Sequence, residues 1–230
     1  MRDRFKDAMW FDTIKRYRPT IGGSGGIGSW LTFLLARAGA TPIVFDFDRI
    51  EEHNIGGQLF DIQSVGEYKV DALQAICEDF SNVIIETHKK KLDQNSLLTK
   101  MCFSAFDNME ARKDMFNKWL TIADEESIFI DGRLTFDNLQ IFCVRGSDAS
   151  SIEEYKRTHL FDDSDVEDAP CTLKQTSHNA AMIASFMVNF YVNHLADLEE
   201  GAEVSTGLFK PPFYTSYYTP FNHLEVEYGE

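Results

Sequence analysis

The sequence is short of positive charge. Its 230 residues include 22 Lys and Arg against 37 Asp and Glu, which gives a formal net charge of −15 at pH 7. Affinity for nucleic acids comes largely from clustered Lys and Arg side chains that neutralise phosphates. The deficit therefore argues against DNA or RNA as a partner, except through a local basic patch.

Cysteine is also scarce, and long apolar runs are missing. The four cysteines are widely spaced without a C-x-x-C pair: Cys77, Cys102, Cys143 and Cys171. Such spacing excludes a zinc ribbon or a redox dithiol and is typical of reduced thiols in a cytosol. No apolar run reaches the ~18 residues that a membrane span needs, and no apolar segment follows the charged N-terminus. We therefore expect a soluble, cytoplasmic protein that does not enter membranes.

Short apolar runs alternate with amphipathic segments along most of the chain. We predict strands over 17–21, 42–47, 82–87, 102–106, 127–131 and 139–144. Helices are predicted after a glycine-rich turn up to Gly39, and over 69–79, 110–123 and 175–195. This alternation predicts an α/β fold with a doubly wound, mostly parallel, Rossmann-like sheet.

The sequence divides into three parts. We expect a short helical arm over residues 1–16, a nucleotide-binding domain over 17–195 and an aromatic C-terminal extension over 196–230. Within the domain, the acidic stretch 148–170 is predicted to be a mobile crossover loop. We expect the extension to cover a surface or a subunit interface rather than to form a domain of its own.

A glycine motif provides the strongest local indication of function. Gly23, Gly25, Gly26 and Gly28 match G-x-G-x-x-G between a predicted strand and a predicted helix. The missing side chains let the backbone approach a phosphate, and the helix N-terminus supplies free N–H groups. Asp46 ends the next strand, near the spacing at which an acidic residue binds a ribose hydroxyl. The motif predicts nucleotide binding, without choosing between a nicotinamide, a flavin and ATP; a purely structural turn is the alternative.

Further motifs follow the glycine motif in a fixed order. They are GSGGIGS at 23–29, LARAG at 35–39, DFDRIE at 46–51, Asn54, Gln58, VGEYK at 65–69 and SAFDNMEAR at 104–112. Together they resemble the ThiF/MoeB and ubiquitin-activating-enzyme family of adenylyltransferases. The resemblance is clear over about residues 20–145 and weaker over 171–195.

The resemblance implies that the nucleotide is ATP, bound with magnesium. In that case Asp46 holds the ribose with Asp48 and Gln58 nearby, Asn54 and Lys69 approach the triphosphate, and Asp107 helps to bind the magnesium ion. Simpler interpretations stay open for three of these residues. Lys69 can be a solvated helix residue, Asp107 a helix cap and Asn54 only a turn former.

The sequence departs from the family at Gly57, where the family has Arg. That Arg would neutralise charge on the transferring phosphates, and Gly cannot replace it. Either another cation serves, with Arg16, Arg18 and Arg112 as candidates, or turnover is slow or absent. The resemblance implies a homodimer in which an N-terminal Arg can reach the neighbouring subunit's site. Arg16 and Arg18 can equally be ordinary surface charges.

Cys171 follows the acidic stretch directly. The resemblance implies that a thiol near this point can accept an activated acyl group, which makes Cys171 the candidate nucleophile among the cysteines. A buried or bystander thiol is the simpler interpretation, because activation of the thiolate needs a nearby base or cation. His178, further along, is expected to be a helix residue rather than that base.

These features together predict ATP- and magnesium-dependent adenylation of a carboxylate. The expected substrate is the C-terminal glycine of a small ubiquitin-like or sulfur-carrier protein, with release of pyrophosphate. Two alternatives remain open. One is a nicotinamide- or flavin-dependent oxidoreductase, which shares the glycine motif and Asp46. The other, suggested by Gly57, is a catalytically inactive nucleotide-binding interaction module.

Overall fold

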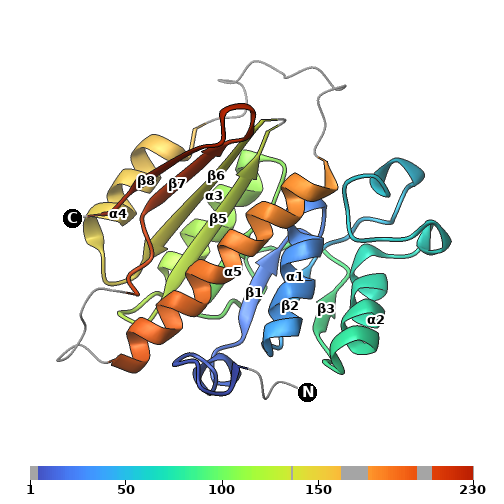
Figure 1. Ribbon diagram of the computed structural model, residues 1–230, viewed down its shortest axis with the longest axis horizontal. Helices are drawn as coiled ribbons and strands as arrows, with labels where there is room; N and C mark the ends of the chain where they lie inside the picture. Colours follow the sequence, from blue (N-terminus) through green and yellow to red (C-terminus); the bar gives the residue numbers. More distant parts are fainter. Residues whose placement is uncertain (1–4, 136, 162–175, 201–208, 230) are drawn as a thin grey trace.

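One eight-stranded sheet forms the centre of the molecule (Figure 1). The computed structural model describes residues 5–135, 137–161, 176–200 and 209–229. The strand order is β3-β2-β1-β4-β5-β6-β7-β8. The strands are β1 (Pro19–Gly22), β2 (Ile43–Phe45), β3 (Glu86–His88), β4 (Met101–Ser104), β5 (Ile128–Leu134), β6 (Asn138–Arg145), β7 (Tyr214–Tyr218) and β8 (His223–Glu227). In this order, neighbouring strands from β3 through β2, β1 and β4 to β5 run parallel. Neighbouring strands from β5 through β6 and β7 to β8 run antiparallel.

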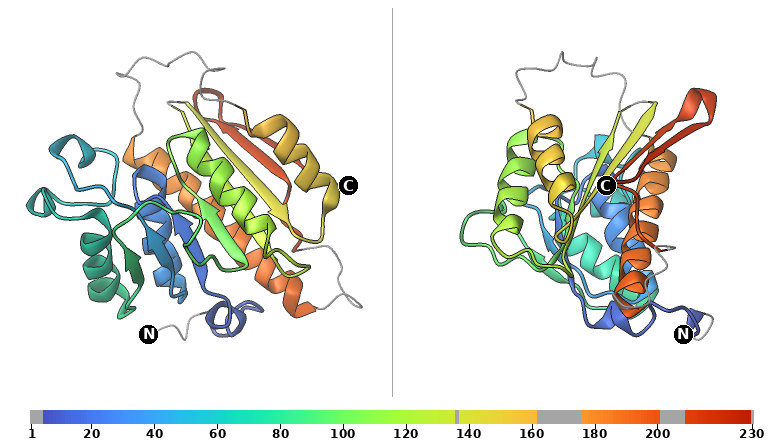
Figure 2. Two further views of the ribbon diagram at one scale, coloured as in Figure 1. Left: turned by 180° about the vertical axis from the view of Figure 1, so that it is seen from behind. Right: turned by 90° about the vertical axis from the view of Figure 1, so that its left-hand side faces the viewer.

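Helices cover both faces of the sheet, as Figure 2 shows from behind and edge-on. Helices α1 (Gly26–Ala38), α2 (Lys69–Ser81) and α5 (Ser177–Glu200) lie on one face. Helices α3 (Met109–Leu120) and α4 (Ala149–Glu154) lie on the other. The predicted doubly wound, mostly parallel α/β fold is therefore confirmed.

Alternation along the strands builds a separate core on each face. Ile128 and Ile130 of β5 point into the core beneath α1 and α5, whereas Phe129 between them points to the opposite face. There Phe129 packs edge-on against Phe116 at 5.1 Å between ring centroids, and Tyr155 lies 4.7 Å from the same Phe116 ring. Strands that are buried on both faces carry apolar residues at most positions, so they appear in the sequence as nearly continuous apolar runs.

The strand order reverses between β1 and β4. The chain passes from β1 outward to β2 and β3, and then returns to the other side of β1 through β4. In open α/β sheets such a reversal leaves a crevice beyond the carboxyl ends of the strands, because the connections diverge there. The glycine motif follows β1 at this point.

The prediction of a loop over residues 148–170 is wrong for its first half. Residues 149–154 form α4, and Tyr155–His159 continue it as a short π-helix. Asp148 caps α4 by accepting a hydrogen bond from Ser151 N at 3.0 Å, and the fully buried Tyr155 anchors the segment in the aromatic core. Acidic residues predict that a segment is exposed, but they do not show that Asp148 caps a helix or that Tyr155 is buried in the core. Residues 162–170 lie outside the described part of the chain.

The aromatic extension is part of the sheet, which the sequence analysis did not predict. β7 pairs with β6 through contacts such as Leu139 opposite Tyr217, and β8 pairs with β7. Tyrosine and threonine favour such half-buried strands. Helix α5 also runs to Glu200, five residues beyond the predicted end at 195. The described part of the N-terminal arm contains the 3-10 helix Thr13–Lys15.

Helix α5 carries a buried histidine. The His194 side chain is 2 % exposed, and its Nε2 lies 2.8 Å from Glu126 O, so this nitrogen carries the proton and donates. Its Nδ1 is buried with no hydrogen-bond partner in the described structure. Burial lowers the pKa of His194 to about 4, because the charged ring would lose its hydration. None of the described helices is long and apolar enough to cross a membrane.

We predict an acid-dependent loss of stability that originates at His194. The unfolded chain takes up a proton on this residue below about pH 6.5, but the folded protein does so only near pH 4. The free energy of unfolding should therefore fall by up to about 3 kcal/mol between these pH values. His194→Gln keeps a donor to Glu126 O but does not titrate, so urea unfolding at pH 7 and 4.5 should show a smaller loss. Equal losses in both proteins would contradict this assignment.

Candidate functional site

The glycine motif packs tightly against the neighbouring strand end. Gly22 O accepts a hydrogen bond from Ala105 N at 2.9 Å, which ties the end of β1 to the end of β4. Gly23 adopts a φ of +88°, and a Cβ there would lie 2.8 Å from Ala105 O. A Cβ on Gly28 would lie 1.9 Å from Gly23 O. Gly23 and Gly28 are therefore required for the fold of the turn itself.

Gly25 differs, because it faces open space. A Cβ on Gly25 would meet only Gln58 Nε2, at 3.9 Å. Helix α1 begins at the next residue without a side-chain cap, so the N–H groups of its first turn face this space. Gln58 Oε1 is buried and has no hydrogen-bond partner among the described residues. The N–H groups suit a phosphate at the helix N-terminus, whereas the spare Gln58 oxygen can accept only from a donor group of the ligand, such as a hydroxyl.

Asp46 holds the glycine turn in place. Its Oδ2 accepts hydrogen bonds from Ser24 N at 2.7 Å and Ser24 Oγ at 2.9 Å, and its Oδ1 accepts one from Asp48 N at 2.8 Å. The side chain is nearly buried, and Ser24 is fully buried. Both carboxylate oxygens therefore serve the chain itself, which the sequence did not indicate. Binding of the ribose by Asp46 stays a prediction.

Asp48 and Lys69 form an ion pair at the same strand end. Lys69 Nζ lies 3.0 Å from Asp48 Oδ2, and Lys69 N donates to Asp48 O at 3.0 Å. The Lys69 side chain is 9 % exposed, whereas that of Asp48 is 49 % exposed. The alternative of a solvated Lys69 is therefore wrong. Asp48 offers the more accessible carboxylate of the two that follow β2.

Asn54 acts as a turn former. Its Oδ1 accepts a hydrogen bond from Glu51 N at 2.9 Å, and Glu51 in return accepts from the Asn54 backbone, closing a short 3-10 helix. Asn54 is 9 % exposed. Asn54 therefore does form a turn, and its contact with a triphosphate stays a prediction. The same loop brings Gln58 to the glycine turn.

Asp107 is exposed just beyond β4. The cap of α3 is its neighbour Asn108, whose Oδ1 accepts from Ala111 N at 2.9 Å. The alternative of a capping Asp107 is therefore wrong. In the described parts of the chain, no three His, Cys, Asp or Glu side chains are grouped to hold a metal. A single carboxylate still fits magnesium, which commonly binds one or two carboxylates together with substrate phosphates.

The sequence profile of the ThiF family matches residues 4–132, more than half of the chain. The chain belongs to the ThiF family. The resemblance stated from the motifs is thereby confirmed. Membership supports nucleotide-dependent adenylation in a general sense.

Solved structures of the ThiF-type fold superpose on this chain. The crystal structure of selenomethionine PaaA has a TM-score of 0.73 and 18 % identity, covering 99 % of this chain and 68 % of PaaA. The structure of E. coli MccB with ATP has a TM-score of 0.66 and 15 % identity, and the match covers 96 % of this chain and 66 % of MccB. The structure of E. coli MccB with AMPCPP and MccA has a TM-score of 0.70 and 14 % identity, and the match again covers 96 % of this chain and 66 % of MccB. This chain thus spans about two thirds of these proteins. No curated protein sequence matches it significantly.

Arg112 of this ThiF-family chain is committed to a buried ion pair. Its guanidinium contacts Asp131 and the Phe106 carbonyl, and it donates to Gly132 O at 3.1 Å. Asp131 also accepts from Arg133 Nε at 2.7 Å. Burial alone would raise the pKa of Asp131, but the two guanidinium groups outweigh it and hold that pKa below its usual value. Release of Arg112 toward a phosphate would leave the buried Asp131 with Arg133 as its remaining ion-pair partner and would lose the stabilisation that Arg112 provides.

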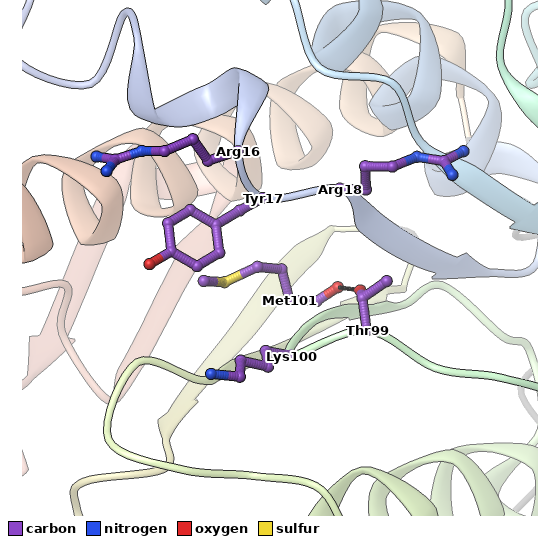
Figure 3. Close-up of a pocket in the computed structure, with 6 residues that line it drawn as sticks. All are labelled: Arg16, Tyr17, Arg18, Thr99, Lys100 and Met101. Atoms are coloured by element: carbon purple, nitrogen blue, oxygen red, sulfur yellow. Dashed lines mark hydrogen bonds between the residues drawn. The ribbon is translucent and has the colours of Figure 1, made fainter.

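Arg16 and Arg18 lie at the opposite end of the sheet. They line a hollow at the amino ends of β1 and β4 and point away from each other (Figure 3). The full lining is Arg16, Tyr17, Arg18, Thr99, Lys100 and Met101. Arg16 pairs with Glu199, and Arg18 pairs with Glu86 at 3.0 Å. β1 separates them from the glycine turn by about 13 Å, so neither belongs to the site of its own chain. The alternative of ordinary surface charges fits their ion pairs, and action on the site of a second copy stays a prediction.

The described cysteines are poor nucleophiles. Cys77, Cys102 and Cys143 are buried, and burial raises the pKa of each thiol, to about 12 for Cys77. Cys171 lies outside the described residues, so its proposed role is untested. His178 is exposed, and its Nε2 lies 3.2 Å from Thr176 Oγ1.

Two glycine substitutions should separate folding from binding. Gly28→Ala forces a methyl group into Gly23 O, and we expect it to lower the free energy of unfolding by about 3 kcal/mol or more. Gly25→Ala meets only the flexible end of Gln58, so its stability should stay close to that of the wild type. Its methyl group occupies the space beside the α1 N-terminus, so calorimetry should show weaker ATP binding. Unchanged ATP binding in folded Gly25→Ala would rule out this space as the phosphate site.

Proposed function

We propose that this chain is an ATP- and magnesium-dependent adenylyltransferase that activates a carboxylate. The observation that carries the proposal is the order of groups along one sheet edge. The Asp48–Lys69 pair, the open glycine turn at Gly25 and the exposed Asp107 follow the adjacent strands β2, β1 and β4. Family membership supports this function, as does the structure of MccB with ATP.

We assign the binding roles to groups that remain available to a ligand after the chain's own hydrogen bonds are formed. We assign the ribose to Asp46 with Asp48 beside it: Asp46 Oδ1 accepts one hydrogen bond from the chain and can accept a second, and the Asp48 carboxylate is the more exposed of the two. The phosphates lie on the N–H groups at the start of α1, where Gly25 leaves space. Lys69, beside Asp48, donates to the phosphates as a compact charge.

Asp107 is the carboxylate assigned to magnesium. When bound, the metal neutralises charge on the phosphates. The residues of this chain contribute mainly positioning and a fixed electrostatic environment, which are the main needs of phosphoryl transfer. An oxygen of the substrate carboxylate attacks the α-phosphorus of ATP, the bond from that phosphorus to the bridging oxygen breaks, and pyrophosphate leaves.

The substrate in this proposal is the C-terminal glycine carboxylate of a small ubiquitin-like or sulfur-carrier protein. The structure of MccB with MccA supports a small partner for this fold. A homodimer is also part of the proposal, in which Arg16 or Arg18 reaches the site of the neighbouring subunit. We further propose a cytoplasmic location, with the arm at 1–16 and a nucleotide-binding domain that begins at 17. The predicted extension at 196–230 begins within α5 and adds β7 and β8 to the sheet of that domain.

A second candidate function is a nucleotide-binding module without catalysis. Gly57 carries no side chain, and Arg112 is engaged by Asp131. Such a module would bind ATP but would not exchange pyrophosphate into it. An oxidoreductase is the weaker alternative, because it gives no role to Lys69 or Asp107; cofactor absorbance in the purified protein would reveal it.

Asp107→Asn should abolish adenylation. The substitution removes the charge assigned to magnesium, and we expect exchange of pyrophosphate into ATP to fall on the order of a hundredfold or more. The assay contains a small ubiquitin-like protein that ends in Gly-Gly. Glu110→Gln, at an exposed position of the adjoining helix, is the matched control and should keep full exchange.

Cys171→Ala should also keep full exchange, because a thiol attacks only after the adenylate has formed. Full exchange in Asp107→Asn would remove Asp107 from the mechanism. ATP binding without exchange in the wild type would favour the inactive module.

A further inference from the structure

The segment between β4 and α3 presents the exposed carboxylate of Asp107. Residues 105–108 form this segment. Asn108 is occupied as the cap of α3, because its Oδ1 accepts from Ala111 N at 2.9 Å. A carboxylate binds a ligand better when its backbone is already held in the right position before the ligand arrives. The contacts that fix the backbone of Asp107 therefore bear on the magnesium ion assigned to it.

Contacts with β1 hold one side of this segment. Ala105 N donates to Gly22 O at 2.9 Å. The Phe106 ring packs directly on Gly22, where a Cβ would lie 2.3 Å from Phe106 Cζ and 2.9 Å from Met115 Sδ. The missing side chain of Gly22 therefore leaves room for the ring. These contacts tie the segment to the strand that leads into the glycine turn.

Arg112 of α3 holds the other side of the segment. Its Nη2 donates to the Phe106 carbonyl, and its Nη1 donates to the Asp131 carboxylate and, at 3.1 Å, to Gly132 O. The Phe106 carbonyl belongs to the peptide group that leads into Asp107. Because a peptide group is planar, fixing this oxygen also fixes Asp107 N and Cα relative to it. One guanidinium thus connects the backbone of Asp107 to both α3 and β5.

The carboxylate that anchors Arg112 is itself fixed. Asp131 is fully buried and also accepts hydrogen bonds from Arg133 Nε at 2.7 Å and from Tyr155 Oη at 2.9 Å. Arg112 is 6 % exposed, so its guanidinium cannot turn to a ligand without losing buried contacts. Its effect on the site therefore passes through the Phe106 carbonyl.

We infer that Arg112 is a positioning residue for Asp107 and thereby sets the affinity of the site for magnesium. This inference rests on the proposed function, which assigns the metal to Asp107. Loss of a group that orients a metal ligand typically lowers metal affinity about 10- to 100-fold. Lysine cannot replace Arg112, because a single ammonium group lacks the planar fork that reaches the Phe106 carbonyl and the Asp131 carboxylate together.

The test compares two variants that each disturb the bonding of Asp131. Arg112→Lys keeps the positive charge but loses the fork, whereas Tyr155→Phe removes one donor to Asp131 and leaves the Phe106 carbonyl untouched. The probe is Mn²⁺ in place of Mg²⁺, titrated by electron paramagnetic resonance with saturating ATP. We expect Mn²⁺ to bind about tenfold more weakly to Arg112→Lys and equally well to Tyr155→Phe and the wild type. Calorimetry with ATP and EDTA should give the same affinity for all three proteins, because no metal takes part.

A double variant tests whether Arg112 acts through Asp107. Asp107→Asn/Arg112→Lys should bind Mn²⁺ no more weakly than Asp107→Asn alone, because Arg112 has no carboxylate left to position. A further loss in the double variant overturns the inference. If Arg112→Lys does not unfold cooperatively in urea, Arg112→Gln/Asp131→Asn takes its place in every comparison. That pair removes both charges, so it leaves no carboxylate buried at position 131.

The other outcomes separate this inference from the proposed function. Wild-type Mn²⁺ affinity in Arg112→Lys, or equal losses in Arg112→Lys and Tyr155→Phe, overturns the inference; if Asp107→Asn binds Mn²⁺ weakly in the same assay, the proposed function stands. Wild-type Mn²⁺ affinity in Asp107→Asn removes the metal from Asp107, and the inference fails with that assignment. If the wild type does not bind ATP, the proposed function and the inference both fail.

Discussion

The hydrogen bonds of the Asp46 carboxylate hold the candidate site together. They connect the turn after β1 to the turn after β2 through Ser24, while the Asp46 backbone connects to β3 through His88 O. A nearly buried carboxylate that accepts backbone N–H groups is strongly bound, because those donors would otherwise be buried without partners. Three strand ends are thereby fixed relative to one another. The space at Gly25 and the Asp48–Lys69 pair both depend on this arrangement.

A second buried carboxylate, that of Asp131, fixes neighbouring segments relative to one another on the other side of β1. Asp131 of β5 binds Arg112 of α3 and Arg133, and Arg112 also contacts the Phe106 carbonyl just before Asp107. The position of Asp107 is therefore set by α3 and β5 through Arg112. The charges of Asp131, Arg112 and Arg133 are paired in the interior. These residues can therefore position the neighbouring Asp107, but they have little freedom to bind a ligand themselves.

The sequence predicted the parts of the molecule that local patterns encode. The glycine motif, the parallel strands and the helix that begins at Lys69 follow from spacing and periodicity. The patterns did not reveal which polar groups the fold uses internally. Asp46 and Asp48 look alike in the sequence, and only the contact of Asp46 with Ser24, 22 residues earlier, distinguishes them. Likewise α4 depends on Tyr155 packing against distant aromatic residues, and β7 depends on the free edge of β6.

The net charge and the local charge of this chain have opposite consequences. At −15, the whole molecule repels a polyphosphate at long range. At physiological ionic strength, however, such repulsion is screened beyond about 8 Å, so binding depends on the charges within that distance. The starts of α1 and α2 and Lys69 lie at the carboxyl ends of the strands, whereas Arg16 and Arg18 lie at their amino ends. The chain thus concentrates positive potential at the carboxyl ends of the strands, and it does so with two helix N-termini and Lys69 rather than with an arginine at position 57.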